Sequence, residues 1–252
     1  MKRILKGVVL LQGLLMLAIA GTAQAADTPA ESYVYGTYLY CDVTRQERAD
    51  EIFNTLYKPI FDAAVADGTI TSYAYYAHNT GGKWRRGIFT VAPSIPALLA
   101  AEDKLYDQAT KKNKKLDDEY GSICGSHEDY IWHSELGNAT TQMDGKAVFS
   151  TYYVCDSREV QADALVKNVF APMYDKLLAD GKLTSWGYLE HIVGGHIRRI
   201  DTMTAKDIPS LMAARGEMVQ MLTDNPLGDL FTEICDSHED YIWEVKASAA
   251  PK

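Results

Sequence analysis

A seven-residue segment, Ser126 to Trp132, recurs without change as residues 237–243. Other matches lie along both copies at an offset of 111–114 residues: Cys41 with Cys155, Gly68 with Gly181, His78 with His191, Arg86 with Arg199, and Ile95 with Ile208. A period of this length is too long for a solenoid repeat, so each copy is expected to be a unit of domain size. We place the copies at residues 32–136 and 146–247, joined by a small, polar linker at residues 137–145.

Residues 1–25 have the features of a secretory signal peptide. A basic start with Lys2 and Arg3 precedes an apolar run at residues 7–20, and a small-x-small motif ends at Ala25, the expected cleavage site. An uncleaved membrane anchor is the alternative, but the apolar run is shorter than the ~20 residues that span a bilayer. We therefore expect a periplasmic or secreted protein with no membrane span after cleavage.

The acidic charge balance restricts the partners of the protein. The chain carries 25 Lys and Arg residues against 34 Asp and Glu residues, a formal net charge of -9. Such a chain repels polyanions, so we expect no nucleic-acid partner. Its hydrophobic fraction of 47% and charged fraction of 23% are average for a globular chain, which excludes disordered and coiled-coil classes.

Each copy predicts the same order of elements. In the first copy, segments rich in Tyr and β-branched residues alternate with segments whose apolar residues have helical spacing. Pro59 is expected to bend or interrupt the first helix, and Gly68 to end it. The predicted order is strand, helix, strand, strand, helix, strand, at residues 34–41, 49–64, 72–78, 84–91, 94–118 and 128–132.

This order is that of a split βαβ, or ferredoxin-like, unit. Together with the duplication, it resembles the modules of the dimeric α+β barrel superfamily, in which two such modules pack sheet against sheet. The resemblance covers nearly the whole chain after the leader and rests on element order. It implies an α+β fold with two tandem ferredoxin-like (βαββαβ) repeats packed as a fused dimeric α+β barrel. A monomer acting as a pseudo-dimer is then expected.

Four cysteines, Cys41, Cys124, Cys155 and Cys235, allow three disulfide pairings. In a ferredoxin-like sheet the first and last strands are antiparallel neighbours, so the end of the first lies beside the start of the last. Cys41 and Cys155 end the first strand of each copy, and Cys124 and Cys235 precede the last. We therefore predict the disulfides Cys41–Cys124 and Cys155–Cys235, formed in an oxidising compartment.

A transition-metal site is the alternative use of these cysteines. Cys124 and His127, like Cys235 and His238, have Cys-x-x-His spacing, and thiolates with imidazoles suit zinc or copper. Both thiolates would have to escape oxidation outside the cytoplasm, which favours disulfides. No cofactor is predicted from the sequence, and haem or a transition metal is left open. For the unchanged segment around these histidines, packing of a strand with a buried Trp132 is favoured over binding.

The chain has no nucleophile elbow, zinc-protease helix, phosphate loop or dinucleotide-binding glycine motif. The remaining candidates are polar residues that both copies share: His78, His191, Arg86 and Arg199. In a two-module barrel, we expect these side chains to meet as a pseudo-symmetric set, where Arg holds an anion and His moves a proton. The alternative is that they are solvated residues at the rim of the hairpins.

Two functions of different classes follow. The first is an exported, disulfide-bonded module that binds a small ligand, an anion included, or an envelope protein. The second, implied by the resemblance, is a small oxygenase- or isomerase-like enzyme. In that enzyme His191 with Glu190 would transfer the proton and Arg199 would hold an anion. A structural role of the duplicated fold in the envelope is a third, and fold analogy alone selects none of them.

Overall fold

The computed structural model describes residues 31–251, so the predicted signal peptide lies outside the described residues. The strands are β1 (Tyr33–Tyr40), β2 (Ser72–Gly81), β3 (Arg86–Ala92), β4 (Ser126–Gly137), β5 (Ala147–Val154), β6 (Ser185–Val193), β7 (Arg199–Ala205) and β8 (Ser237–Ala249). The helical elements are α1 (Gln46–Ile52), η1 (Phe53–Tyr57), α2 (Lys58–Ala66), α3 (Ile95–Ile123), α4 (Glu159–Leu165), η2 (Val166–Phe170), α5 (Ala171–Ala179), α6 (Ile208–Thr223) and α7 (Pro226–Ile234). Over these residues, no helix has the length and apolarity needed to cross a membrane.

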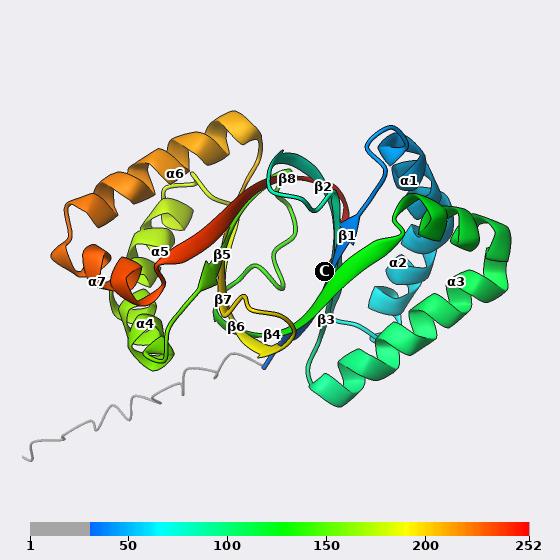
Figure 1. Ribbon diagram of the computed structural model, residues 1–252, viewed down its shortest axis with the longest axis horizontal. Coiled ribbons are helices and arrows are strands. Elements are labelled where there is room, and N and C mark those ends of the chain that lie inside the picture. The colour runs from blue at the N-terminus through cyan, green and yellow to red at the C-terminus, as the bar shows by residue number, and fades with distance from the viewer. Residues whose placement is uncertain (1–30, 252) are drawn as a thin grey trace, which may run out of the picture. The chain divides into compact units, whose positions relative to one another are not determined.

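The eight strands form one closed antiparallel barrel in the order β1-β3-β2-β8-β5-β7-β6-β4. We call β1 to β4 with their helices the first half, and β5 to β8 with theirs the second half. Within each half, the first strand lies between the third and the fourth. The halves join along two seams, β2 with β8 and β4 with β6. Figure 1 shows α1 to α3 on one side of the barrel and α4 to α7 on the other. The predicted mixed α+β barrel is therefore confirmed.

The first helical segment of each half contains a π-helical turn directly before its proline. In the first half, η1 separates α1 from α2, and Pro59 lies in the first turn of α2. In the second half, η2 precedes Pro172 in the same way. Proline has no N–H and clashes with the carbonyl four residues earlier, so a wider turn accommodates it. The predicted interruption at Pro59 thus takes the form of a π turn.

The second helix differs between the halves. The first half has α3, which runs to Ile123 with a non-helical residue at Asn113, whereas the second half has two shorter helices, α6 and α7. Both α3 and α6 begin as predicted, with a side-chain cap at Ser94 or Asp207 followed by proline in the first turn. The cleft between this helix and the sheet therefore has a different lining in each half.

The barrel interior is filled by aromatic side chains. Trp84, Trp132, Trp243, Tyr38 and Tyr152 are all fully buried there, in stacked or edge-to-face contacts with one another or with neighbouring rings. Two further apolar clusters pack the outer faces of the sheet against the helices of each half. The repeated Tyr-Ile-Trp sequence thus alternates between the inner and the outer face of the sheet.

The repeated glycine pairs of the two hairpins meet the repeated segment of the opposite half. A Cβ atom at Gly194 would lie 2.3 Å from Cδ1 of Tyr130, and one at Gly82 would lie 2.2 Å from the hydroxyl of Tyr241. Gly194 also has a φ of +141°, which favours glycine. Each seam therefore depends on a tyrosine of one half packing on a glycine pair of the other. This contact is a packing reason for the unchanged seven-residue segment.

The segment predicted as a linker packs against the barrel. Thr140 is buried, and its carbonyl oxygen accepts a hydrogen bond from the Ser72 hydroxyl. The side-chain oxygen of Asn138 accepts from the backbone N–H of Trp186. Ala139 and Met143 line a cavity of about 60 Å³ together with residues of the barrel interior. The connection between the halves is thus part of the packed structure.

Both disulfides have the predicted pairing, Cys41 with Cys124 and Cys155 with Cys235. The strand order explains it, since β1 pairs with β4 and β5 pairs with β8 in antiparallel register. Because all four sulfur atoms are in disulfides, they are not available as thiolate ligands. This corrects the alternative of a metal held by Cys124, His127, Cys235 and His238.

Candidate functional site

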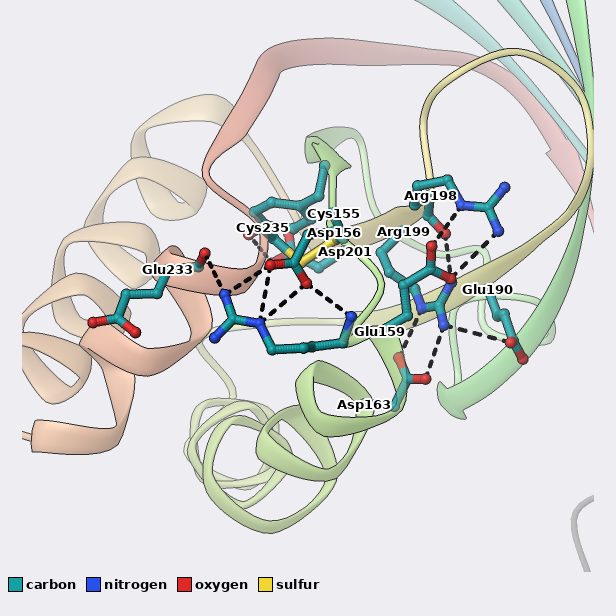
Figure 2. The surroundings of a disulfide bond; sticks show 12 residues. Cys155, Asp156, Glu159, Asp163, Glu190, Arg198, Arg199, Asp201, Glu233 and Cys235 are labelled. Carbon is teal, nitrogen blue, oxygen red and sulfur yellow. Dashed lines mark hydrogen bonds and ion pairs between the residues drawn. A yellow bond between two sulfur atoms is a disulfide. The ribbon is translucent and has the colours of Figure 1, made fainter.

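Arg86 and Arg199 are buried on the helix side of the sheet, where carboxylates hold them. Two nitrogens of Arg86 lie 2.6 Å and 2.9 Å from the carboxylate oxygens of Asp50. Two nitrogens of Arg199 lie 2.7 Å and 2.8 Å from those of Asp163, as Figure 2 shows. Such bidentate pairs fix the start of a strand to the first helix of its half. These guanidinium groups serve the fold rather than facing a free anion site.

His78 and His191 lie on the opposite face of the sheet, toward the barrel interior. Nδ1 of His191 is 2.8 Å from Arg198, and the ring meets Trp132 edge-on. Nδ1 of His78 is 3.0 Å from Arg85. Burial, reinforced by the neighbouring arginines, lowers the pKa of both histidines. The structure therefore does not bring the predicted set of two imidazoles and two guanidiniums together, because adjacent strand residues face opposite sides.

The predicted proton-transfer pair is separated for the same reason. Glu190 lies on the helix side, 3.4 Å from Arg199, whereas the His191 ring lies toward Trp132. Burial and the nearby Glu135 raise the pKa of Glu190. The Glu190 carboxyl group therefore lies near Arg199 and Glu135 and does not face the His191 imidazole.

One group of three side chains among residues 31–251 has the composition of a metal site. The ligand atoms of His133, Glu135 and Glu190 lie within 4.8 Å of one another, and all three side chains are partly exposed. His133 and Glu190 are direct partners across the β4–β6 seam. Arg199 already offsets part of the negative charge of this group.

A cavity of about 500 Å³ lies between α3 and the outer face of the first half's sheet. Its floor is formed by residues of β1, β3 and β4, and its wall by α3. We call it the Glu102 cavity. Its lining comprises Tyr35, Thr37, Leu39, Ile88, Glu102, Asp103, Tyr106, Asp107, Thr110, Tyr120, Cys124, His127 and Asp129. The volume is sufficient for a small organic molecule.

Glu102 is the most unusual group in this cavity. It is only 7% exposed, and its Oε1 atom has no hydrogen-bond partner. Burial raises the pKa of Glu102 to about 7, and the Thr90 hydroxyl offsets only part of this effect. A carboxyl group that titrates near neutrality in a cavity can accept or donate a proton under physiological conditions.

The repeated segment places further polar groups beside Glu102. Oδ2 of Asp129 lies 2.9 Å from Nδ1 of His127, while its Oδ1 atom is buried without a partner. Burial and the negative charge of Asp129 raise the pKa of Tyr35 to about 12, so its hydroxyl stays protonated. Tyr35, His127 and Asp129 thus add a neutral phenol, an imidazole and a second carboxyl group to the lining of the cavity.

The matching cleft of the second half has different chemistry. Arg215 stands at the repeat position of Glu102, and Asp201 at that of Ile88. Asp201 accepts hydrogen bonds from the hydroxyls of Tyr153 and Tyr174. Burial raises the pKa of Asp201, and the positive charge of Arg215 opposes this. The second half thus supplies its own cation where the first half has an unpaired carboxyl group.

Glu102 was not among the site residues predicted from the sequence, although the sequence contains a signal for it. Leu98, Ala101, Leu105 and Ala109 form the buried face of α3, and Glu102 lies within that spacing. A charged residue on the apolar face of a helix is uncommon unless it has a function or a partner.

No family model matches this sequence, and no curated protein matches it. A structure from Fusobacterium nucleatum, provisionally assigned as a monooxygenase, has a TM-score of 0.64 at 9% identity, covering 88% of this chain and 96% of that one. A Lactobacillus acidophilus structure with the same assignment has a TM-score of 0.60 at 10% identity, covering 87% and 96%. An anthrone oxidase-like protein has a TM-score of 0.55 at 14% identity, covering 88% and 93%. At these identities the similarity shows that the chain shares the fold of these structures, a closed barrel with helices on its outer faces.

Proposed function

We propose that this chain binds a small organic molecule in the Glu102 cavity and that Glu102 transfers a proton there. The observation that carries the proposal is the buried Glu102 carboxyl group, whose Oε1 atom has no hydrogen-bond partner and which lines a cavity of about 500 Å³. Burial raises its pKa to about 7. Placing an ionisable group in such a site costs stability, and functional sites are where such costs are found.

The reaction class is proton abstraction or donation on a small, partly aromatic substrate. Tyr35, Tyr106 and Tyr120 line the cavity and can contact an aromatic or aliphatic body, while Glu102 reaches a polar atom. Isomerisation, or the deprotonation that precedes oxygenation, needs such a base. The assignments of the similar monooxygenase structures agree with this class. Of the two functions predicted from the sequence, we therefore prefer the enzyme, with Glu102 as the proton-transferring residue in place of His191 and Glu190.

The setting of the proposed function is extracytoplasmic. We propose that residues 1–25 direct export, that both disulfides form afterwards, and that residues 32–136 and 146–247 are ferredoxin-like repeats of one fused pseudo-dimer. The two cysteine pairs and the strand order of each half support this. Only the first repeat is proposed to carry the proton-transferring site, because Arg215 replaces Glu102 in the second.

The test begins with the titration of Glu102 itself. Carbon-13 NMR of the side-chain carboxyl groups, compared between the wild type and Glu102→Gln, should reveal one carboxyl group that titrates near pH 7. The exposed Glu233 is the matched control, because Glu233→Gln should leave the signal near pH 7 unchanged. If Glu102→Gln also left that signal unchanged, or if no signal titrated near pH 7, the proposed role would be refuted.

The second part of the test locates ligand binding. A library of small organic molecules is screened by thermal shift against the wild type and Thr110→Trp, which places a large side chain at the exposed rim of the cavity. Ligands of the Glu102 cavity should stabilise the wild type and lose this effect in Thr110→Trp. For a compound that is also converted, Glu102→Gln should lower the turnover rate about 100-fold or more.

A further inference from the structure

The Glu102 cavity is lined by acidic residues, of which only Asp107 has a lysine partner within residues 31–251, Lys111 at 3.1 Å. Four acidic residues contribute to its lining, Glu102, Asp103, Asp107 and Asp129, and none of the described lining residues is Lys or Arg. His127 is the one lining imidazole, and it already pairs with Asp129. The deepest of the carboxyl groups, Glu102, has an unpartnered oxygen atom. An anionic ligand would be repelled from this cavity.

In the second half, the corresponding cleft contains a cationic side chain of the protein itself. Arg215, at the repeat position of Glu102, opposes the rise that burial causes in the pKa of Asp201, and it lies 5.0 Å from the ring centre of Phe149. The cleft of this fold therefore accommodates one organic cation placed near a carboxylate and an aromatic ring. The first half retains carboxylates and aromatic rings but lacks the internal cation.

Aromatic rings line the Glu102 cavity on several sides. Tyr35 comes from β1, and Tyr106 and Tyr120 come from the two parts of α3. The face of a tyrosine ring attracts ammonium and quaternary ammonium groups, and several rings together form the usual recognition site for such groups. Carboxylates with aromatic rings are thus a matched set for an organic cation.

A divalent metal ion fits this cavity less well. Metal ions require several oxygen or nitrogen ligands gathered around one point. The one group of three such ligands found within residues 31–251 is His133, Glu135 and Glu190, which lies outside the Glu102 cavity. The carboxylates of the cavity are too dispersed to form a compact coordination shell.

We propose that the ligand of the Glu102 cavity is a small organic cation, a protonated amine or a quaternary ammonium compound, whose charge takes the place that Arg215 fills in the second half. This inference rests on the proposed function and names its substrate class. A bound cation stabilises the ionised form of Glu102, so the residue acts as the base in the complex.

Cation binding should strengthen as pH rises through the range in which Glu102 ionises. The groups near Glu102 are Asp129 from β4, Tyr35 from β1, Thr90 from β3, and Asp103 and Tyr106 on α3 itself, and His127 lines the same cavity. The Glu102→Gln variant separates the ionisation of Glu102 from any other effect of pH on binding, because Gln does not titrate.

The test uses the full chain after leader removal and two ligands of nearly equal shape, choline and its uncharged analogue 3,3-dimethylbutan-1-ol. Isothermal titration at pH 8 should give about tenfold tighter binding of choline. Glu102→Gln should lower the choline affinity about tenfold and leave the affinity for the alcohol unchanged. Glu233→Gln, the matched control, should change neither. Lowering the pH to 5.5 should weaken choline binding more in the wild type than in Glu102→Gln.

The failures of the two proposals are distinguishable. Equal or tighter binding of the alcohol, blocked by Thr110→Trp, would overturn the cation preference and leave small-molecule binding in the cavity supported. Choline binding that neither Glu102→Gln nor Thr110→Trp affects would place the cation elsewhere and overturn this inference. Displacement of choline by millimolar Ca²⁺ from the wild type but not from Glu102→Gln would assign the site to a metal ion instead. If neither these ligands nor the screened library binds in the cavity, both proposals fail.

Discussion

The Glu102 carboxyl group is buried on the apolar face of α3, where a leucine or alanine would pack better. Desolvation penalises the charged form of a carboxyl group, and no lysine or arginine lines the cavity to compensate. The residue therefore makes the folded protein less stable whenever it is ionised. In the second half, Arg215 at the same repeat position balances Asp201 instead, so the two copies of one element now have different electrostatics.

Replacing Glu102 by Gln should change stability in a pH-dependent way. Its pKa is about 7 in the folded chain against 4.5 in the unfolded one, so the wild type loses stability as pH rises through this interval. Gln does not titrate. The free energy of unfolding of the variant should therefore exceed that of the wild type by up to about 3 kcal/mol above pH 7, and should equal it below pH 4.5.

Urea unfolding at pH 4 and pH 8 measures this gain. Glu233→Gln is the control. The Glu233 side chain is exposed, so this substitution should leave the free energy of unfolding unchanged at both pH values. A gain from Glu102→Gln that is the same at both pH values would mean that Glu102 titrates normally.

Arg199 contributes to stability through its buried ion pair. Its side chain is 1% exposed and holds Asp163 and Glu159 at distances of 2.7–2.9 Å. Arg199→Met should lower the free energy of unfolding by about 3–5 kcal/mol, because it leaves carboxylates without their partner. Arg158→Met, which breaks the exposed pair with Asp156, should lower the free energy of unfolding far less in the same urea experiment. Similar losses from the two substitutions would contradict the structural role of Arg199.

At the scale of elements, the two hairpins decide how the halves meet. The β6–β7 hairpin carries Gly194 and Gly195, which lie against Tyr130 of β4, and the β2–β3 hairpin lies in the same way against Tyr241 of β8. Each seam is thus formed by main-chain pairing of two strands and by one tyrosine ring that packs on the glycines of the opposite half. A Cβ atom at these glycines would collide with the ring or with the backbone of the opposite half.

Gly194→Ala should destabilise the β4–β6 seam. The alanine would need a positive φ of 141° and would place its Cβ atom 2.3 Å from Tyr130. A loss of about 1–3 kcal/mol is expected in thermal unfolding. Gly216→Ala is the matched control on α6, where nothing lies within 4 Å, and helix propensity predicts a small gain. If Gly194→Ala behaved like Gly216→Ala, the contact with Tyr130 would not be formed.

At the scale of the whole molecule, closure of the barrel requires both halves. The first half alone would leave β2 and β4 without their partners β8 and β6. Open strand edges pair with other chains, and a second copy of the same half offers the matching edges. Barrel closure and the disulfide of each half both stabilise the fold. Each disulfide closes a loop of 83 or 80 residues and can add up to about 4.5 kcal/mol to the free energy of unfolding.

A fragment containing residues 31–145 should therefore form a dimer. Its two edge strands can reproduce the β2–β8 and β4–β6 pairings with a second copy of the fragment. Light scattering after gel filtration, with the full chain measured for comparison, gives the mass directly. A folded, monomeric fragment at micromolar concentration would show that barrel closure is not needed for stability of the half.

Much of the architecture was predictable because it depends on local patterns and on the repeat. Alternating apolar residues gave the strands, Pro96 and Ser94 gave the start of α3, and the strand order then gave both disulfide pairings. The candidate site was not predictable in this way. The residues that both copies share, such as Arg86, proved to hold the fold together, whereas Glu102 differs between the copies.

The duplication in the sequence by itself determined two like halves, their order of elements and the placement of the cysteines, because those features follow from spacing along the chain. Only the tertiary structure decided which face each polar side chain occupies and which charges lack a partner. The antiparallel pairing of β1 with β4 and the packing of α3 over the sheet set these relations. They bring together Glu102, Asp129 and Tyr35, which are far apart in sequence. Burial, and with it the pKa of Glu102, is a property of that assembled environment and has no counterpart in the chain alone.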